Sequence, residues 1–384
     1  MLHRVLSTAE KTLGCALRVD GDIGLLERPR RALLISRGER NPTPGDARIQ
    51  ATLRATQHLL DANEVLVAGT DRHPWDLALW TCRQRAGSAV VALCDGASRP
   101  DFLPENVLCV WPESNAQPAD KTARLLLRDR LAGLLASSAY SLQIRPGGNM
   151  ARIADELTDR GCNVEAWTVE TLERPEAQPL DQSHEVAATA PIPPADCLTH
   201  FTREPDGLWP NERYADFLHW LSSGPTFTPR DAFHSLRRMA SEKRIQGCGR
   251  LIGGGTPMVC LTQRDPASLL ADNQWRKGLQ RWMYSHYALS FDRAALVALG
   301  ARPVRYGDAA TLSALPSAER CFAQVASSAG IDWRKEAEWR VRGDLDFSSV
   351  RSEHVTAWVA TPAEAAAIAR EFQIRALVIS PREL

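Results

Sequence analysis

The sequence predicts an α/β protein in two parts: a doubly wound, mostly parallel sheet, followed by a smaller α+β domain. Two observations carry this prediction. From residue 31 onward, short β-branched runs alternate with longer stretches of helical periodicity, and strands joined by such helices form parallel sheets through right-handed crossovers. After a proline-rich segment at 171–196 the elements become shorter, and seven of the eleven Trp lie between 197 and 384.

The first domain is expected to span residues 1–170. Short apolar runs such as Ala32-Leu-Leu-Ile-Ser36 predict strands, and apolar residues three or four apart predict helices. In chain order we expect a strand at 32–36, a helix at 47–60, a strand at 64–68, a helix at 74–85, strands at 88–93 and 107–111, a helix at 121–137, a strand at 140–144, a helix at 149–160 and a strand at 163–167.

The second domain is expected to span residues 197–384, after a linker at 171–196 that contains five prolines and no periodicity. Its shorter, mixed elements predict an antiparallel or mixed sheet. We expect strands at 197–201, 257–262, 287–291, 303–306, 339–341, 355–359 and 376–379, and helices at 213–221, 230–241 and 363–370.

The composition excludes several classes of protein. The 384 residues carry 46 Lys or Arg and 46 Asp or Glu, so the whole chain lacks the positive excess that attracts nucleic acid or anionic lipid. No apolar run is long enough for a membrane span and no signal peptide is visible, so we expect a cytoplasmic protein without membrane contact. The nine cysteines are scattered and never spaced CxxC, so neither a disulfide framework nor a metal site is expected.

Three turns of the first domain indicate a phosphate-binding design. Each follows a predicted strand and combines glycine with arginine: Ser36-Arg37-Gly38-Glu39-Arg40, Gly69-Thr70-Asp71-Arg72-His73 and Arg145-Pro146-Gly147-Gly148-Asn149. Glycine lets a ligand approach the backbone, and the arginine fork binds phosphate oxygens in pairs. Because ligands of doubly wound sheets bind at the carboxyl ends of strands, the expected nucleotide-binding residues are Arg37, Gly38, Gly69, Thr70, Arg145, Gly147 and Gly148. Ordinary turn chemistry would also place glycine after a strand.

These motifs resemble a known superfamily. The strand ending in Ser36-x-Gly-x-Arg40, the run Ala68-Gly-Thr-Asp71 with Trp75-Asp-Leu-Ala78 after it, and Gly147-Gly-Asn-Met150 are similar to the Rossmann-like fold shared by DprA DNA-processing proteins and LOG nucleotide phosphoribohydrolases (SLOG). The resemblance covers residues 30–170. It implies binding of a nucleotide, a nucleotide-derived signal or single-stranded DNA. The catalytic Glu of the LOG signature is absent, and Asn149 stands near its place.

The second domain carries the candidate catalytic residues. The strand around His200, the aromatic run 282–287 and the late strand beginning at Glu338 resemble the His, Tyr and Glu of ADP-ribosyltransferase folds, and the first and last of these also look like DUF2971-type proteins of bacterial defence neighbourhoods. The resemblance implies that His200 holds the ribose of NAD, that Tyr284 or Tyr287 stacks on nicotinamide, and that Glu338 stabilises the developing positive charge. A core histidine and a surface ion network are the structural alternatives, with Cys248 and Cys260 as other candidate nucleophiles.

A nucleic-acid surface is expected within residues 230–282. This stretch has ten Arg or Lys against four Asp or Glu, interleaved with Trp275 and Trp282. Basic groups beside aromatic rings suit single strands and flipped bases, although a solvated helix face would give the same count. The candidate nucleic-acid-binding residues are Arg276, Lys277, Arg281 and Trp282.

Three functions therefore stay open. The first is a transferase-like enzyme acting on a nucleotide or nucleic acid, with NAD or another nucleotide as cofactor and partner proteins of a bacterial defence or DNA-modification system. The second is a nucleobase-modifying enzyme acting on DNA, of the 7-deazaguanine type or similar. The third is a sensor without catalysis, in which the first domain binds a nucleotide signal and the second binds a protein.

Overall fold

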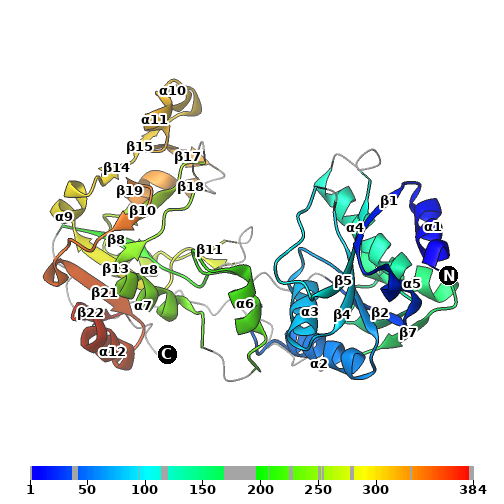
Figure 1. Ribbon diagram of the computed structural model, residues 1–384. Helices are drawn as coiled ribbons and strands as arrows, with labels where there is room; N and C mark the ends of the chain where they lie inside the picture. The colour runs from blue at the N-terminus through cyan, green and yellow to red at the C-terminus, as the bar shows by residue number, and fades with distance from the viewer. Residues whose placement is uncertain are drawn as a thin grey trace. The chain divides into compact units, whose positions relative to one another are not determined.

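The computed structural model groups into two compact units (Figure 1). Unit 1 comprises Met1–Arg174 and Asp206–Thr228, and unit 2 comprises Pro175–Pro205 and Pro229–Leu384. The structure describes residues 2–36, 42–94, 96–113, 120–167, 196–205, 207–224, 228–249, 252, 255–276, 281–328 and 331–379.

Unit 1 is built on a mostly parallel sheet, named sheet A, with strand order β1-β5-β4-β3-β2-β6-β7 in the described residues. Only β1 runs antiparallel to its neighbour β5. The elements are α1 (Leu2–Leu13), β1 (Leu17–Gly21), β2 (Arg30–Ile35), α2 (Ala47–Asp61), β3 (Val65–Gly69), α3 (His73–Gln84), β4 (Ser88–Ala92), β5 (Asn106–Pro112), α4 (Lys121–Leu135), β6 (Ser138–Leu142), α5 (Asn149–Asp159), β7 (Asn163–Ala166) and α6 (Tyr214–Leu221), with a 3-10 turn at Ile23–Glu27.

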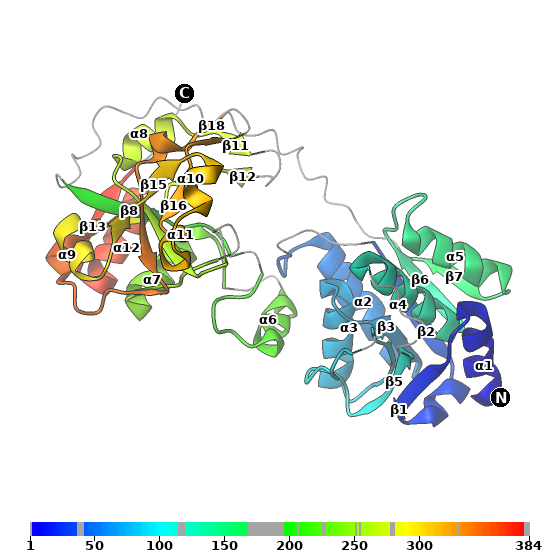
Figure 2. The ribbon, with the colours of Figure 1, turned by 90° about the horizontal axis from the view of Figure 1, so that it is seen from above.

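Helices cover both faces of sheet A. Helix α2 packs against α3, while α4 packs against α1 and α5, and Figure 2 shows α2 and α3 on one side of the strands and α1 and α5 on the other. All five residues of β3 are buried, as expected for a parallel strand enclosed on both faces. From β2 the chain proceeds through β3 and β4 to β5, and then returns to β6 on the other side of β2. The winding direction therefore reverses between β2 and β6.

Unit 2 is built on a mixed sheet, named sheet C, with strand order β14-β19-β10-β8-β13-β21-β22 in the described residues. Its neighbouring strands are antiparallel except for β21 and β22. The main elements are β8 (Cys197–Phe201), α7 (Ala232–Glu242), β10 (Met258–Thr262), α8 (Pro266–Ala271), β13 (Ala288–Asp292), α9 (Arg293–Ala298), β14 (Arg302–Pro303), α10 (Ala309–Ser313), α11 (Ser317–Arg320), β19 (Glu338–Arg342), β21 (Val355–Val359), α12 (Pro362–Phe372) and β22 (Arg375–Val378). Short two-stranded ladders join β9 (Arg244–Ile245) to β20 (Leu345–Asp346), β11 (Trp275–Arg276) to β12 (Arg281–Trp282), β15 (Arg305–Gly307) to β16 (Ala323–Val325) and β17 (Ser327–Ser328) to β18 (Ile331–Asp332).

The two faces of sheet C differ in chemistry. One face is apolar, with Leu198 and Leu289 in a core that α7 and α12 complete through Leu236 and Ile368. The opposite face carries hydroxyl groups buried among the strands. Thr199 and Ser290 are hydrogen bonded at 2.6 Å, and the indole N–H of Trp358 donates to Ser290 at 2.6 Å. Because side chains alternate along a strand, each sheet residue is assigned to one of these faces by its register.

The fold class predicted from the sequence is confirmed. Every strand and helix expected in residues 32–167 is present, with ends shifted by a few residues at most. The sequence prediction omitted α1, β1 and the short helices α8 to α11. Residues 206–228, assigned above to the second domain, group by contacts with unit 1, because α6 packs on α3. The predicted linker at 171–196 lies outside the described residues, apart from Asp196.

Candidate functional site

The reversal of winding between β2 and β6 places their carboxyl ends side by side. In doubly wound sheets this switch point is where loops diverge and leave room for a ligand. The residue after β2, Ser36, accepts a hydrogen bond through Oγ from the backbone N–H of Arg145, which follows β6, at 2.7 Å. The turns after β2 and β6 therefore meet at one point of the sheet edge, and β3 lies next to β2.

The turn after β3 begins with Gly69, which lies against the ring of Trp75 on α3. A Cβ on Gly69 would lie 2.5 Å from the Trp75 ring and 3.0 Å from Nε of Arg128, so only glycine fits there. The Trp75 indole N–H donates to the carbonyl of Leu33 at 2.7 Å. Thr70 is 3% exposed, and its carbonyl oxygen accepts from the Arg128 guanidinium. Gly69 and Thr70, expected to touch a nucleotide, thus have internal packing roles.

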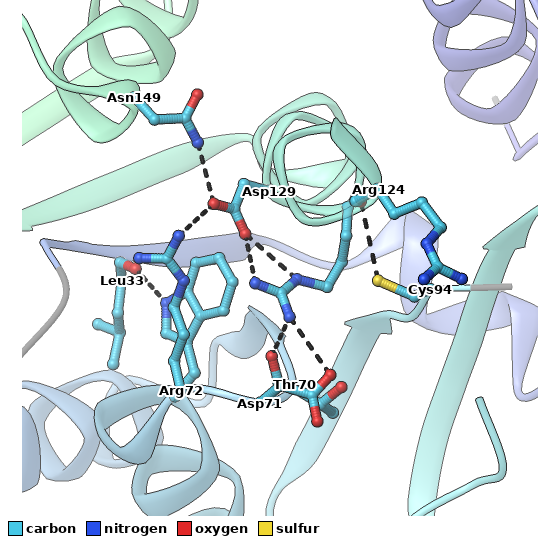
Figure 3. Close-up of polar contacts among 10 residues, drawn as sticks. Leu33, Thr70, Asp71, Arg72, Cys94, Arg124, Asp129 and Asn149 are labelled. Atoms are coloured by element: carbon cyan, nitrogen blue, oxygen red, sulfur yellow. Dashed lines mark hydrogen bonds and ion pairs between the residues drawn. The ribbon is translucent and has the colours of Figure 1, made fainter. Parts of the chain in front are cut away.

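A buried carboxylate joins this turn to the start of α5. The Asp129 side chain on α4 has no exposed surface. It accepts hydrogen bonds from Arg72 Nη2 at 2.5 Å, from its neighbour Arg128 Nη2 at 2.7 Å and from Asn149 Nδ2 at 2.9 Å (Figure 3). Donors from the β3–α3 turn, from α4 and from α5 therefore share one acceptor. We name Arg72, Arg128, Asp129 and Asn149 the Asp129 cluster.

Charge in the Asp129 cluster is balanced internally, whereas one nearby arginine is not. Arg128 also lies 3.5 Å from the exposed carboxylate of Asp71, so two arginines face two aspartates. Arg145, in contrast, is exposed, and its guanidinium has no ion-pair partner among the described residues. Arg145 therefore adds an uncompensated positive charge to this part of the edge, at the turn before α5.

Three helices that begin at this edge lack a side-chain cap. The N-cap residues of α2, α3 and α5 are Asp46, Arg72 and Gly148, and none accepts a hydrogen bond from its helix through its side chain. The Asp46 carboxylate accepts from the N–H of Thr43 instead. By contrast, Asp120 caps α4 by accepting from Ala123. An uncapped first turn leaves N–H groups that point outward and carry partial positive charge.

The structure places only part of the expected phosphate-binding set. Arg37 and Gly38 lie outside the described residues. Gly147 has φ +67°, a left-handed conformation that favours glycine, and it is exposed at the turn. Gly148 is the N-cap of α5. The turns after β3 and β6 thus lie at the same sheet edge, and ligand contact by these residues stays a prediction.

The proposed catalytic pair of unit 2 is not brought together. Thr262 on β10 pairs both with Glu338 on β19 and with Thr199 on β8, so these three residues lie on one face of sheet C. His200 follows Thr199 and points to the opposite face, where its Nδ1 bonds to the carbonyl of Cys260 at 2.8 Å. Burial lowers the pKa of His200. The expectation that His200 and Glu338 share one site is therefore wrong, because neighbouring strand residues alternate in direction.

Glu338 is held in a buried ion pair. Arg340, on the same face of β19, donates to both carboxylate oxygens at 2.9 Å and also to the carbonyl of Cys321 at 2.8 Å. The two side chains are 10% and 4% exposed. Cys260 lies beside this pair, and burial together with the Glu338 charge raises the pKa of its thiol to about 12. A thiol with so high a pKa is a weak nucleophile at neutral pH.

The two candidate stacking tyrosines have structural partners. The Tyr287 hydroxyl donates to Glu364 at 3.0 Å, and Glu364 belongs to the capping box of α12. Burial, followed by the bond to Glu364, raises the pKa of Tyr287. Tyr284 packs on Phe201 with ring centroids 4.9 Å apart. A nicotinamide-stacking role for either ring stays a prediction.

The expected nucleic-acid surface is described only in part. Trp275 on β11 is 39% exposed and packs edge to face with Trp282 on β12, with centroids 5.7 Å apart. Lys277 lies outside the described residues, and the structure does not describe the side chains of Arg276 and Arg281. Several other arginines of the stretch 230–282 are paired with carboxylates, so they contribute less positive charge to a nucleic-acid surface. These pairs are Arg237 with Glu371, Arg238 with Glu242, Arg244 with Asp344 and Arg264 with Asp272.

The Asp129 cluster was missed from the sequence. One signal was present, because Arg128 and Asp129 interrupt the apolar face of α4, and charged residues are rarely buried without a partner. The partners themselves, Arg72 and Asn149, come from other turns and have no local spacing to Asp129. Within the described residues, no group of three or more His, Cys, Asp or Glu could hold a metal ion. The helices of the described chain include none that is long and apolar enough to cross a membrane.

Comparisons with known proteins give partial structural similarity only. No protein-family model matches the sequence, and no curated protein matches it significantly. The X-ray structure of DNA processing protein A (DprA) from Streptococcus pneumoniae matches 41% of this chain and 56% of its own, less than two thirds of its length, with 16% identity and a TM-score of 0.34. A structure of DprA from Helicobacter pylori, described as showing its single-stranded DNA binding mode, matches 39% of this chain and 70% of its own, with 19% identity and a TM-score of 0.31. The resemblance of the second domain to ADP-ribosyltransferases stays a prediction.

Proposed function

We propose that the carboxyl edge of sheet A binds the phosphate group of a nucleotide, either free or within a single strand of nucleic acid. One observation carries this proposal. The adjacent strands β3, β2 and β6 are each followed by a helix without a side-chain cap, at the point where the winding of the sheet reverses. We name this region, from Ser36 through the turns at 69–72 and 145–149, the open edge.

Elementary electrostatics favours an anion at the open edge. The first N–H groups of a helix carry partial positive charge and are hydrogen-bond donors that lack partners within the helix. Phosphate accepts several such bonds at once, and helix N-termini are a common place for it. Arg145 adds a full positive charge immediately before α5, from an exposed side chain that needs no ion pair to be broken among the described residues.

The surrounding contacts would hold these donors in place before a ligand arrives. The Asp129 cluster fixes Asn149, the first residue of α5, to α4 and to the β3–α3 turn. Ser36 fixes the backbone of Arg145. A ligand that meets such a preorganised set of donors loses less binding free energy to ordering the protein.

A second candidate function, a nucleotide sensor without catalysis, is favoured by the state of the expected catalytic residues. Glu338 and Arg340 satisfy each other, and His200 faces the opposite side of sheet C. A transferase-like enzyme of a defence or DNA-modification system that used Glu338 would need that carboxylate to be accessible. Mass spectrometry of NAD, DNA and RNA after incubation with the full chain separates the two, since only an enzyme yields a product.

Calorimetry with defined probes tests the phosphate proposal. We expect the full chain to bind inorganic phosphate weakly, and adenosine diphosphate or a single-stranded oligonucleotide more tightly. Arg145→Ala should weaken that binding by about 1–3 kcal/mol, the scale of a charge-assisted hydrogen bond. The matched control is Arg54→Ala, which removes an exposed arginine from the middle of α2. Absence of binding to all three probes would contradict the proposal, as would equal losses in both variants.

A further inference from the structure

Helix α6 docks on α3 through aromatic and apolar side chains. Phe217, Leu218 and Leu221 of α6 are buried in the core of unit 1. The rings of Tyr214 and Phe102 pack edge to face with centroids 5.4 Å apart, and His73 packs against Phe217 at the same distance. The flanking segments of the chain, Pro175–Pro205 and Pro229–Leu384, group with unit 2. Helix α6 therefore belongs to unit 1 through its own side-chain contacts, although the segments before and after it group with unit 2.

The polar part of this contact is a short chain of hydrogen bonds. The Tyr214 hydroxyl donates to Oδ2 of Asp76 at 2.7 Å, and Nδ1 of His73 lies 3.1 Å from the same hydroxyl. Asp76 is 2% exposed, and its other oxygen, Oδ1, has no hydrogen-bond partner among the described residues. A buried oxygen without a partner is costly when it carries negative charge and far less costly as part of a neutral carboxyl group.

The charges that face Asp76 come from three elements. The hydroxyl of Tyr214 on α6, Arg128 on α4 and the backbone N–H of Asp71 favour its ionisation, while the carboxylate of Asp71 on the β3–α3 turn opposes it. Burial outweighs these contributions and raises the pKa of Asp76 to about 7. The carboxyl group of Asp76 therefore titrates close to neutral pH while α6 is docked.

We propose that Asp76 and Tyr214 form a proton-sensitive latch that docks α6 on α3. When Asp76 is neutral, Tyr214 still donates to Oδ2 and no unpaired charge is buried. When Asp76 is ionised, the buried Oδ1 is left without a donor, and undocking of α6 relieves this by letting water reach the carboxylate. The latch does not rest on the proposed function of the open edge.

The direction of the pH effect follows from the two states. Docking raises the pKa of Asp76 to about 7, whereas a solvated aspartate titrates near 3.9. The docked state is therefore fully favoured below pH 4, becomes less favoured as pH rises toward 7, and changes little above it. Between pH 5 and pH 8 the docking equilibrium should fall by about a hundredfold if undocking fully exposes the carboxylate.

Hydrogen exchange of the full chain measures this directly. We expect the amides of Tyr214–Leu221, corrected for their intrinsic exchange rates, to be protected less at pH 8 than at pH 5. Asp76→Asn, which keeps the shape and removes the charge, should make this protection independent of pH. The matched control is Asp216→Asn on the same helix, because Arg213 lowers the pKa of that exposed carboxylate and keeps it ionised over the whole range.

Tyr214→Phe provides a second variant that keeps the ring contacts. It should lower the protection of α6 at both pH values, because the donor to Asp76 is lost. The latch is refuted if the wild-type chain shows equal protection at pH 5 and pH 8, a result that depends on no variant folding. It is also refuted if Asp76→Asn keeps the wild-type pH dependence.

Discussion

The helices of the two units begin in different ways. In unit 2, helices α7, α8, α9, α10 and α12 each begin at a residue whose side chain accepts from the first turn, namely Asp231, Asp265, Asp292, Asp308 and Thr361. The four-residue helix α11 is an exception. At the open edge of unit 1, the helices α2, α3 and α5 have no such acceptor. Five of the six helices of unit 2 in the described residues thus have a side-chain acceptor for their first turn, and the three helices at the open edge have none.

The buried ion pairs of the two units also differ in how many segments of the chain they join. Arg340 donates hydrogen bonds to Glu338 and to a nearby backbone carbonyl, so the pair stabilises the fold of unit 2. Asp129 instead draws together groups from three segments, and so positions the start of α5 beside Arg145. A buried charge thus closes a local ion pair in unit 2, whereas in unit 1 it joins three segments at the edge of sheet A.

The largest expected effect concerns Glu338. Glu338→Gln should lower the free energy of unfolding of unit 2 by about 3 kcal/mol, because it leaves the buried Arg340 without a charged partner. Urea denaturation followed by tryptophan fluorescence measures this loss. If stability were unchanged while an activity on NAD or nucleic acid disappeared, Glu338 would be a catalytic residue. The conclusion that its ion pair with Arg340 stabilises the fold of unit 2 would then be wrong.

The next effect concerns the ladder of β11 and β12, with Trp275 and Trp282, as a competing nucleic-acid surface. If it binds a single strand, removing the charges of Arg276, Lys277 and Arg281 together should lower the logarithmic salt slope of binding by about 2, since each phosphate contact contributes about 0.7. The slope is measured by titrating an oligonucleotide at several salt concentrations. Arg145→Ala provides the comparison from the open edge. An unchanged slope in the triple variant would show that these three residues do not contact phosphate groups, and the open edge would remain the proposed phosphate site.

The smallest effect concerns a single cap in unit 2. Thr361→Ala should cost about 1 kcal/mol of stability, because the first turn of α12 loses its side-chain acceptor. Thr361→Ser keeps the hydroxyl and is the control, with an expected change of a few tenths of a kcal/mol. Stability is measured by thermal unfolding. Equal stability of the Ala and Ser variants would show that the side-chain cap of α12 does not stabilise unit 2, and the comparison of helix caps between the units would lose its energetic basis.

Much of the fold could be predicted from local patterns. The β3 run and the helix starting near Pro74 are each specified by hydrophobicity and by residues with fixed backbone preferences, and the parallel order follows from their alternation. The short helices α8 to α11 were missed because they are too brief to show helical periodicity. The Asp caps of α8, α9 and α10 were the available signal.

The candidate sites were harder to predict, because they depend on which strands become neighbours. Gly69 was predicted to contact a nucleotide, and the structure gives a packing reason for glycine there, the nearby Trp75 ring. His200 and Glu338 were paired by resemblance, but the register of β8 against β10 places them on opposite faces. The bond from Tyr214 to Asp76 joins residues 138 positions apart in the sequence. Such contacts are set by the packing of whole elements, which local spacing does not encode.

One measurement tests the open edge most directly, namely the phosphate affinity of two variants at the N-cap of α5. A side chain at Gly148 would approach the Arg145 carbonyl to 3.0 Å in both Gly148→Asp and Gly148→Ala, so this crowding cancels between them. Only the aspartate adds an acceptor and a negative charge at the helix N-terminus. We predict that calorimetry with adenosine diphosphate shows Gly148→Asp binding at least about tenfold more weakly than Gly148→Ala. Equal affinities would contradict the proposal that this N-terminus is kept open for phosphate.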